Sequence, residues 1–393
     1  MAEYIIAGDG VAGTTAAENI RKLDNKGRIT IVTDEDLPFY YRIRLDDYIS
    51  GDINQNKLIA KKESWYEQNN INLILNTKIT GADPQKKMVI TDKEERLCYD
   101  KLLVATGSHS FIPHINGSDK KGVFAIRDIR DARDIMEYAK GIHDVVVIGG
   151  GLLGLEAGNT FRKMNKNVTV VEFFPRILPR QLDVDGAERL KSIMEGMGLC
   201  FRLDARTEAI EGGDVVKAVK LAGGEILDAQ MVIISAGVRP NLELAEPLGL
   251  ECDKGIKVND RLGTNRPDVY AAGDVAEFKG LVYGIWPAAM EQGKIAGANM
   301  AGKDMIYPGT TMANTLKVVG IDLASAGEID AENKFESQTV STENMYKKIV
   351  IDNNRIIGCI MLGETKTFGR VTKLMSSRSD ISPVKDKILK GDF

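Results

Sequence analysis

The chain has 393 residues, which is enough for roughly two or three domains with cores of their own. Its 43% hydrophobic and 27% charged residues are ordinary for a globular protein, and a net charge of −4 is too small to indicate nucleic acid or a membrane surface as a partner. No apolar run is long enough to span a bilayer, and the four cysteines form no C-x-x-C pair or metal-ligand cluster. We therefore expect a cytoplasmic protein without a metal site.

The first element is an apolar strand over 4–7, which leads into the glycine pattern Gly8-x-Gly10-x-x-Gly13 and then into a helix of small residues. In a dinucleotide-binding turn the first glycine permits the tight turn and the second lets the backbone approach a pyrophosphate. The third lets the helix pack closely on the strand. By itself, the pattern is equally compatible with a flexible turn.

A second strand, over 28–33, supports the dinucleotide interpretation because the acidic pair Asp34 and Glu35 follows it. This pair comes about 20 residues after Gly13, where an acid that binds an adenosine ribose is expected. An aromatic cluster then precedes Arg42, whose guanidinium suits a bidentate contact with a pyrophosphate. The alternative for this segment is a surface loop with stacked tyrosines.

The strongest sequence signal is that the whole pattern occurs twice. A strand over 145–148 leads into a second glycine pattern over 149–154 and a helix, and the next strand ends in Glu172. In the first copy a later buried strand ends in Ala105-Thr106-Gly107, and in the second copy the equivalent strand ends in Ser-Ala-Gly237. This internal duplication indicates two dinucleotide-binding units in one chain.

The remaining chain returns to the first unit and then adds a small domain. A strand near 270 ends in Gly273-Asp274, which would direct a carboxylate into the crevice at the strand ends. A helix begins at Trp286-Pro287 and runs to Met300, with proline suited to its first turn. Beyond Gly302 we expect an α+β domain with strands over 316–321, 347–351 and 356–362 and a helix over 366–376.

Two dinucleotide sites suggest a hydride relay between a nicotinamide and a resident flavin, in which the protein orients the two rings. Glu172 would accept hydrogen bonds from a ribose 2′-hydroxyl, whereas a 2′-phosphate would meet a like charge there. Phe173-Phe174 offer no compensating base. We therefore expect NADH rather than NADPH as the substrate.

The motifs at 8–13, 105–107, 149–156 and 270–274 together resemble the pyridine nucleotide-disulfide oxidoreductase superfamily. The segment from Leu37 to Leu45 is similar to NADH:rubredoxin oxidoreductases and to the NADH-oxidising part of assimilatory nitrite reductases. It is also similar to oxygenase-coupled ferredoxin reductases and apoptosis-inducing factor. The resemblance implies an α/β fold of two Rossmann-like domains plus a small α+β domain. The expected boundaries are 1–112 and 242–303 for the FAD-binding domain, 113–241 for the inserted NAD-binding domain and 304–393 for a C-terminal interface domain.

The same resemblance implies roles for individual residues. FAD would be bound by Gly8, Gly10, Val11, Ala12, Gly13, Asp34 or Glu35, Arg42, Ile79, Ala105, Thr106, Gly107, Gly273, Asp274 and Trp286. NAD would be bound by Gly149, Gly151, Leu152, Leu153, Gly154, Glu172, Arg180 and Gly237. Glu156 matches a glutamate beside the nicotinamide and is the expected catalytic residue.

The implied activity is that of an FAD-dependent NADH oxidoreductase that passes electrons to a small redox protein, and the expected carrier is rubredoxin. Disulfide reductases of the superfamily carry redox cysteines after the acidic pair, but residues 37–50 contain none, so thiol–disulfide and peroxide chemistry are not expected. Asp47 stands where ferredoxin reductases carry a lysine near the flavin N5, and Arg44 is a candidate substitute. The alternatives are an NADH-dehydrogenase subunit of a larger, nitrite reductase-like complex and a flavoprotein that senses NADH without rapid turnover.

Overall fold

The computed structural model describes residues 1–310 and 313–390. The chain splits into two compact units: the first comprises Met1–Tyr48, Ile53–Ser110 and Val238–Thr311, and the second comprises Ile49–Asp52, Phe111–Gly237 and Met312–Phe393. Each unit contains a five-stranded parallel sheet, which confirms the expected α/β class with two Rossmann-like folds. Within the described residues, no helix is both long and apolar enough to cross a membrane.

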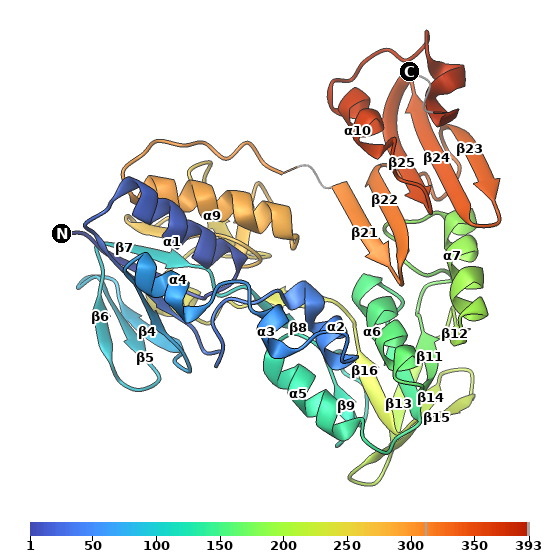
Figure 1. The fold of residues 1–393 in the computed structure, drawn as a ribbon, viewed down its shortest axis with the longest axis horizontal. Coiled ribbons are helices and arrows are strands. Elements are labelled where there is room, and N and C mark those ends of the chain that lie inside the picture. The colour runs from blue at the N-terminus through green and yellow to red at the C-terminus, as the bar shows by residue number, and fades with distance from the viewer. Residues whose placement is uncertain (311–312, 391–393) are drawn as a thin grey trace. The chain divides into compact units, whose positions relative to one another are not determined.

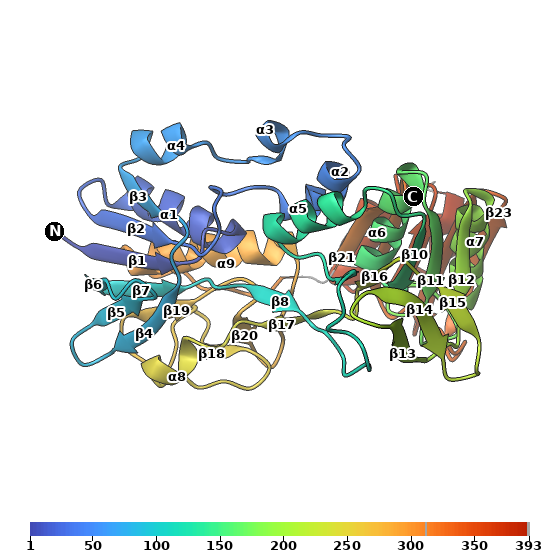
Figure 2. The same cartoon turned by 90° about the horizontal axis from the view of Figure 1, so that it is seen from below.

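The parallel sheet of the first unit has the strand order β19-β7-β1-β2-β3 (Figure 2). Its central strand β1 (Glu3–Ala7) is apolar and buried, and it pairs with β2 (Arg28–Val32) on one side and β7 (Lys101–Val104) on the other. The outer strands are β3 (Ile71–Ile74) and β19 (Val269–Ala271). Because parallel strands end at the same edge, the turns that follow β1, β2 and β7 meet there.

Helix α1 (Val11–Leu23) follows the first glycine turn and packs against α9 (Trp286–Met300), which has proline in its first turn as expected (Figure 1). The two helices meet through small residues. A Cβ on Gly293 would lie 2.3 Å from the carbonyl oxygen of Ala12, and one on Gly297 would lie 2.5 Å from that of Ala16. This backbone contact is possible only because both positions lack a side chain.

Shorter elements complete the first unit. An antiparallel sheet contains β4 (Ile79–Asp83), β5 (Met88–Thr91) and β6 (Arg96–Cys98). Two further pairs join β8 (Ser108–Ser110) to β17 (Val238–Pro240) and β18 (Ile256–Val258) to β20 (Ala276–Phe278). The short helices are α2 (Leu45–Ile49), α3 (Gln55–Leu58), α4 (Glu63–Gln68) and α8 (Ala245–Leu248), with a 3-10 turn over Arg42–Arg44.

The second unit repeats the strand arrangement of the first. Strand β10 (Asp144–Ile148) lies at the centre between β11 (Asn167–Val171) and β16 (Met231–Ile234), as β1 lies between β2 and β7. The outer strands are β12 (Leu199–Arg202) and β9 (Val123–Phe124). The helices are α5 (Ile129–Tyr138), α6 (Leu152–Lys163) and α7 (Val184–Gly196), and an antiparallel sheet contains β13 (Thr207–Gly212), β14 (Val216–Leu221) and β15 (Ile226–Asp228).

The C-terminal part of the second unit is a five-stranded antiparallel sheet in the order β21-β22-β25-β24-β23, accompanied by α10 (Phe368–Ser376) and a 3-10 turn over Lys385–Lys390 (Figure 1). Its core includes Ile349, Cys359, Met361 and Val371. The strands are β21 (Ala313–Val318), β22 (Ile321–Gly327), β23 (Glu336–Thr342), β24 (Met345–Asp352) and β25 (Arg355–Leu362). The expected α+β character is thus confirmed.

One expected strand, over 316–321, is wrong. Strand β21 ends at Val318, the chain reverses over Val319 and Gly320, and β22 begins at Ile321, with Val318 and Ile321 paired. Val319 and Gly320 have φ values of 55° and 84°. Two consecutive residues with positive φ make the tight turn that matches the twist of a two-residue hairpin. Because apolar residues stand on both sides of the turn, the sequence pattern looks like one continuous strand.

The contact between α1 and α9 predicts that Gly293→Ala destabilises the protein by about 1–3 kcal/mol, because the new methyl group collides with backbone that cannot move independently. Urea unfolding monitored by circular dichroism measures this loss. The control is Gly369→Ala in α10, where a Cβ meets nothing within 4 Å and alanine favours the helix. If Gly293→Ala unfolds at the wild-type urea concentration, the close helix contact does not exist.

Candidate dinucleotide-binding sites

In the first unit, the glycine turn between β1 and α1 depends on two very close backbone approaches. Gly8 has a φ of +112°, and a Cβ there would lie 2.2 Å from the carbonyl oxygen of Ala105, at the end of β7. A Cβ on Gly13 would lie 2.0 Å from the carbonyl oxygen of Gly8. A Cβ on Gly10, by contrast, would meet nothing within 4 Å. Two glycines therefore serve the fold, and the middle one leaves open space at the start of α1, next to Val11 and the buried Ala12.

The second unit builds the same turn between β10 and α6. Gly149 has a φ of +119°, and its Cβ would lie 2.2 Å from the carbonyl oxygen of Ser235, at the end of β16. A Cβ on Gly154 would lie 1.9 Å from the carbonyl oxygen of Gly149, while one on Gly151 would meet nothing within 4 Å. The open position is again at a helix start, where free N–H groups and the helix dipole favour a phosphate. Leu152 and Leu153 form the first turn of α6, and Leu153 is half exposed.

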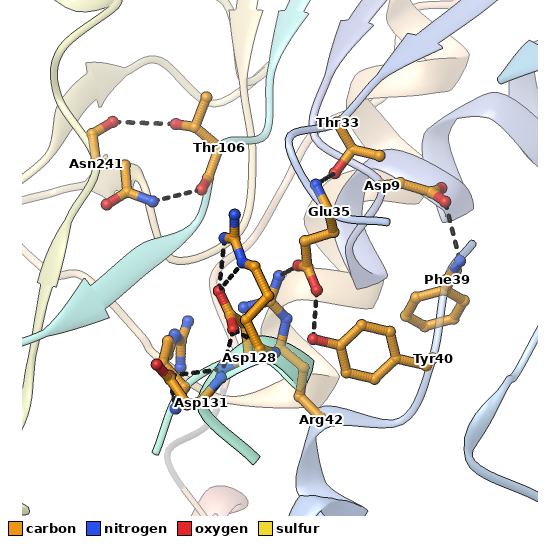
Figure 3. A network of polar contacts seen from close by, with 12 residues as sticks. Asp9, Thr33, Glu35, Phe39, Tyr40, Arg42, Thr106, Asp128, Asp131 and Asn241 are labelled. Atoms are coloured by element: carbon orange, nitrogen blue, oxygen red, sulfur yellow. Dashed lines mark hydrogen bonds and ion pairs between the residues drawn. The ribbon is translucent and has the colours of Figure 1, made fainter. Parts of the chain in front are cut away.

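The two acids after β2 have different surroundings. Asp34 is exposed, whereas Glu35 is buried and its carboxylate accepts hydrogen bonds from the Tyr40 hydroxyl and the Arg42 guanidinium (Figure 3). The expected pyrophosphate ligand Arg42 is thus held in an ion pair and is about one third exposed. Ile79 lies close by in the fold, in the same apolar cluster as Val32.

The turns after β7 and β19 are fixed by side chains. Thr106 and Asn241 exchange two hydrogen bonds, from Thr106 Oγ1 to the Asn241 carbonyl (3.0 Å) and from Asn241 Nδ2 to the Thr106 carbonyl (2.7 Å) (Figure 3). Asp274 accepts a hydrogen bond from Ser108 (2.8 Å), and the Gly273 amide donates to Gln292 (2.8 Å). Gly107, like Gly237 in the second unit, has a positive φ and open space where a Cβ would stand.

Trp286, at the start of α9, belongs to an aromatic cluster. Its ring stacks on Tyr41, with centroids 5.8 Å apart and an interplanar angle of 25°, and lies 5.8 Å from the ring of Phe39. The stacking in this segment is thus between Tyr41 and Trp286. The stack brings the segment before Arg42 to the start of α9.

Asp9, inside the first glycine pattern, was missed by the sequence reasoning. It is 8% exposed and accepts hydrogen bonds from Thr14 Oγ1 (2.9 Å) and the Tyr66 hydroxyl (2.8 Å). It also accepts a hydrogen bond from the Phe39 amide (2.9 Å), which Figure 3 shows. Burial raises the pKa of Asp9 to about 7, against the lowering effect of these hydrogen bonds. The sequence did contain a chemical signal for Asp9. A carboxylate between two glycines of a phosphate-binding turn would repel the phosphate, so its side chain is expected to point away and to be held by hydrogen bonds.

In the second unit, Glu172 follows β11 and is 6% exposed. One carboxylate oxygen accepts a hydrogen bond from the Gly150 amide (2.5 Å) and the other accepts one from the Phe174 amide (2.8 Å). Glu172 is thereby fixed against the glycine turn. Phe173 and Phe174 lie beside it with more than half and half of their surfaces exposed, respectively.

The other two expected residues of the second site lie on different elements. Glu156 is in α6, and its carboxylate accepts a hydrogen bond from the amide of Val319 (3.0 Å), at the β21–β22 turn. Arg180 is exposed on the segment between Glu172 and α7. That segment contacts the glycine turn through a hydrogen bond from the Leu178 amide to the Gly150 carbonyl (2.9 Å).

Two Rossmann-like folds, each with a glycine turn open at a helix start, define a protein class with two dinucleotide sites in one chain. Residues 2–293 match the family model described as pyridine nucleotide-disulphide oxidoreductase, and residues 313–379 match the rubredoxin NAD+ reductase C-terminal domain. The chain belongs to the pyridine nucleotide-disulphide oxidoreductase family, and membership implies FAD binding and an NAD(P)H substrate. The expected family is thus confirmed.

Individual relatives agree with this assignment. An NAD(P)H nitrite reductase of Bacillus subtilis (strain 168) is 35% identical over 97% of this chain and 48% of the relative. The NADH-rubredoxin oxidoreductase of Clostridium acetobutylicum is 30% identical over 95% of this chain and 94% of the relative. The crystal structure of NADH:rubredoxin oxidoreductase from Clostridium acetobutylicum superposes with a TM-score of 0.85 and 28% identity, covering 99% of each chain. The chain spans about half the length of the nitrite and nitrate reductase relatives.

The buried Asp9 carboxyl predicts a specific dependence of stability on pH. Its pKa is about 7 in the folded protein and near 3.8 in the unfolded chain, so the folded state binds more protons between these values. The free energy of unfolding of the wild type, minus that of Asp9→Asn, should therefore fall by up to about 1.4 kcal/mol per pH unit as the pH rises from about 4 to about 7. Urea unfolding of both proteins at several pH values measures this difference. A difference that is constant or rises over this range would show that Asp9 is ionised when buried.

Proposed function

We propose that the chain is an FAD-dependent NADH oxidoreductase that passes electrons to a small redox protein, rubredoxin or a similar carrier, without a redox-active cysteine. The single observation that carries the proposal is the pair of glycine turns with the same geometry, one in each Rossmann-like fold. FAD, when bound, supplies an acceptor that takes a hydride and can release its electrons singly or in pairs. The chain's own residues bind, orient and protect the two nucleotides.

In this proposal the first unit holds FAD. Gly10 and the start of α1 receive the pyrophosphate, with Arg42 as its cation and Asp34 or Glu35 as the acid for the adenosine ribose. Thr106 and Asp274 would face the isoalloxazine and ribityl parts. The hydrogen bonds from Asn241 and Ser108 support these assignments because they hold both residues in place before a ligand arrives. The further FAD residues are Gly8, Val11, Ala12, Gly13, Ile79, Ala105, Gly107, Gly273 and Trp286.

The second unit would hold NADH. Gly151 and the start of α6 receive the pyrophosphate, Glu172 accepts from the ribose hydroxyls, and Glu156 lies at the nicotinamide end. The two backbone hydrogen bonds to Glu172 support this role, since they fix a buried acceptor against the glycine turn. The remaining NAD residues are Gly149, Leu152, Leu153, Gly154, Arg180 and Gly237.

The choice of a one-electron protein acceptor is supported from two sides. Residues 37–50 offer no cysteine for an internal thiol relay, and residues 313–379 match a rubredoxin reductase domain. The relative named NADH-rubredoxin oxidoreductase matches along 94% of its own length. The second candidate is an NADH-oxidising part of a larger reductase, and the specific observation that favours it is the 35% identity with the NAD(P)H nitrite reductase. Co-purification with a partner and a gel-filtration mass well above that of one chain would support this second candidate.

Glu172 predicts a preference between the two nicotinamide nucleotides. Because its carboxylate is buried and fixed, a 2′-phosphate would meet a like charge, and we expect kcat/KM for NADPH to be about 100-fold or more below that for NADH. Glu172→Gln keeps an acceptor oxygen but removes the charge. We therefore expect the kcat/KM values of this variant for NADH and NADPH to lie closer together than those of the wild type. Steady-state kinetics with both nucleotides tests this. A wild type that prefers NADPH, or an unchanged ratio in the variant, would contradict the proposed role.

The electron relay predicts the order of events in an anaerobic stopped-flow experiment on the FAD-loaded protein. NADH should bleach the flavin absorbance near about 450 nm within a turnover time, and oxidised rubredoxin should then restore it. Ferredoxin serves as the comparison acceptor. If NADH bleaches the flavin quickly but neither carrier restores the absorbance, the second candidate, an NADH-oxidising part of a larger reductase, is favoured. Absence of bleaching would refute the proposed NADH site.

A further inference from the structure

The C-terminal sheet contains two consecutive buried lysines on strand β24. Lys347 and Lys348 are 5% and 2% exposed, and neighbouring strand residues point to opposite faces of the sheet. Lysine is almost never this deeply buried unless it is paired. The two lysines have different partners. Lys347 pairs with a residue of the C-terminal domain itself, whereas Lys348 pairs with a residue of the dinucleotide fold.

Lys348 reaches Asp183, the residue that precedes α7. The Lys348 Nζ lies 3.1 Å from Asp183 Oδ2 and donates to the Asp330 carbonyl at 2.9 Å, with Asp330 Oδ2 at 3.8 Å. The hydroxyl of Tyr346, on the same strand, donates to Asp183 Oδ2 at 2.6 Å. Burial raises the pKa of Tyr346, and its bond to Asp183 raises it further, so the phenol stays protonated and remains a donor. Asp183 is thus held by two side chains of the C-terminal domain.

The contact around Asp183 is tightly packed. Asp183 Oδ1 accepts from the Gly186 amide (3.0 Å) and so caps α7, which packs against β24 (Figure 1). A Cβ on Gly186 would lie 3.2 Å from the ring of Tyr346. Arg189, one turn further along α7, donates to the carbonyl of Glu343 (3.2 Å). Asp183 is therefore fixed at the interface between the helix and the sheet.

The segment before Asp183 connects this interface to the glycine turn. The Leu178 amide donates to the Gly150 carbonyl (2.9 Å), and the Leu182 amide donates back to the Leu178 carbonyl (2.9 Å). Leu178 and Leu182 are fully buried. One end of this short turn is attached to the glycine turn and the other to Asp183, and the exposed Arg180 lies between them.

We propose that Asp183, held by Lys348 and Tyr346, is a positioning residue through which the C-terminal domain sets the affinity of the second dinucleotide site for NAD(H). The inference rests on the proposed function, because it takes the ligand of this site to be a nicotinamide nucleotide. Asp183 does not touch the nucleotide in this scheme. It fixes the turn at 178–182, which in turn fixes the Gly150 carbonyl and the position from which Arg180 reaches the ligand.

Removal of either donor should loosen that turn. Without Lys348, two carboxylates would remain in a buried site without their cation, so Asp183 would have to move toward water. Without the Tyr346 hydroxyl, Asp183 keeps its ion pair but loses one of its fixed donors. Nucleotide binding would then have to restore the order of the turn, which lowers affinity but leaves the geometry of hydride transfer intact once the nucleotide is bound.

Lys347 provides a matched control. It pairs with Glu364, which follows β25, so this ion pair lies entirely within the C-terminal domain. Lys347→Met and Lys348→Met each remove one buried lysine from the same strand. If the effect came from a general loosening of the C-terminal domain, both variants would change the nucleotide site equally. The contact with Asp183 is lost only in Lys348→Met.

The test measures flavin reduction at several NADH concentrations by anaerobic stopped flow on FAD-loaded wild type, Tyr346→Phe, Lys348→Met and Lys347→Met. Tyr346→Phe and Lys348→Met should raise the apparent Kd for NADH about five- to tenfold, with the limiting rate of bleaching changed less than about twofold. Lys347→Met should change neither value. Tyr346→Phe keeps all the buried charges paired and so decides the question if Lys348→Met does not fold.

Three results would overturn the inference: an unchanged Kd in Tyr346→Phe, an equal rise in Lys347→Met, or a fall in the limiting rate without a change in Kd. Calorimetric titration of the same proteins with NAD+ measures affinity without flavin reduction. A wild type that binds NAD+ but is not bleached by NADH would contradict the proposed function, while the comparison of variants would still decide the role of Asp183. A wild type that binds no nicotinamide nucleotide contradicts both.

Discussion

The rest of the structure depends on the close approach of backbone to backbone at the glycine turns. At Gly8 and Gly13, and again at Gly149 and Gly154, a Cβ would lie within about 2 Å of a carbonyl oxygen, far inside van der Waals contact. This approach brings the start of a helix to the ends of the parallel strands. The middle glycine of each turn remains open, and a phosphate can therefore meet free N–H groups at each helix start.

Buried carboxylates stabilise the surroundings of both turns, in different ways. Asp9 binds two hydroxyls and one amide, which attaches the segment at Phe39 to the first turn. Glu172 binds two amides, which attaches the end of β11 to the second turn. At Asp9, burial outweighs these donors and raises the pKa to about 7, so the carboxyl group takes up a proton more readily than an exposed acid beside an anion site. In the first unit the acid supports the loop, whereas in the second it also suits a ribose.

The C-terminal domain contacts the second dinucleotide fold at two separate places. The β21–β22 turn donates a backbone hydrogen bond to Glu156, and β24 holds Asp183. A domain that matches a rubredoxin reductase module is therefore joined to both ends of the expected NADH site. Both contacts lie within the second compact unit.

The sequence by itself determined the duplicated Rossmann-like fold, the family and the strands and helices that carry the glycine turns, because apolar strands and glycine spacing are short-range signals. It also singled out Glu172 and the start of α9. Only the tertiary structure decided that Glu35 is paired with Arg42 and that Asp9 is buried. Likewise, Tyr346 meets Asp183 across 163 positions of the chain, and the strand expected over 316–321 divides at a turn set by backbone φ values. The Tyr346–Asp183 contact depends on which distant residues the fold brings together, whereas the other features depend on side-chain orientation and backbone angles that apolar and glycine patterns do not specify.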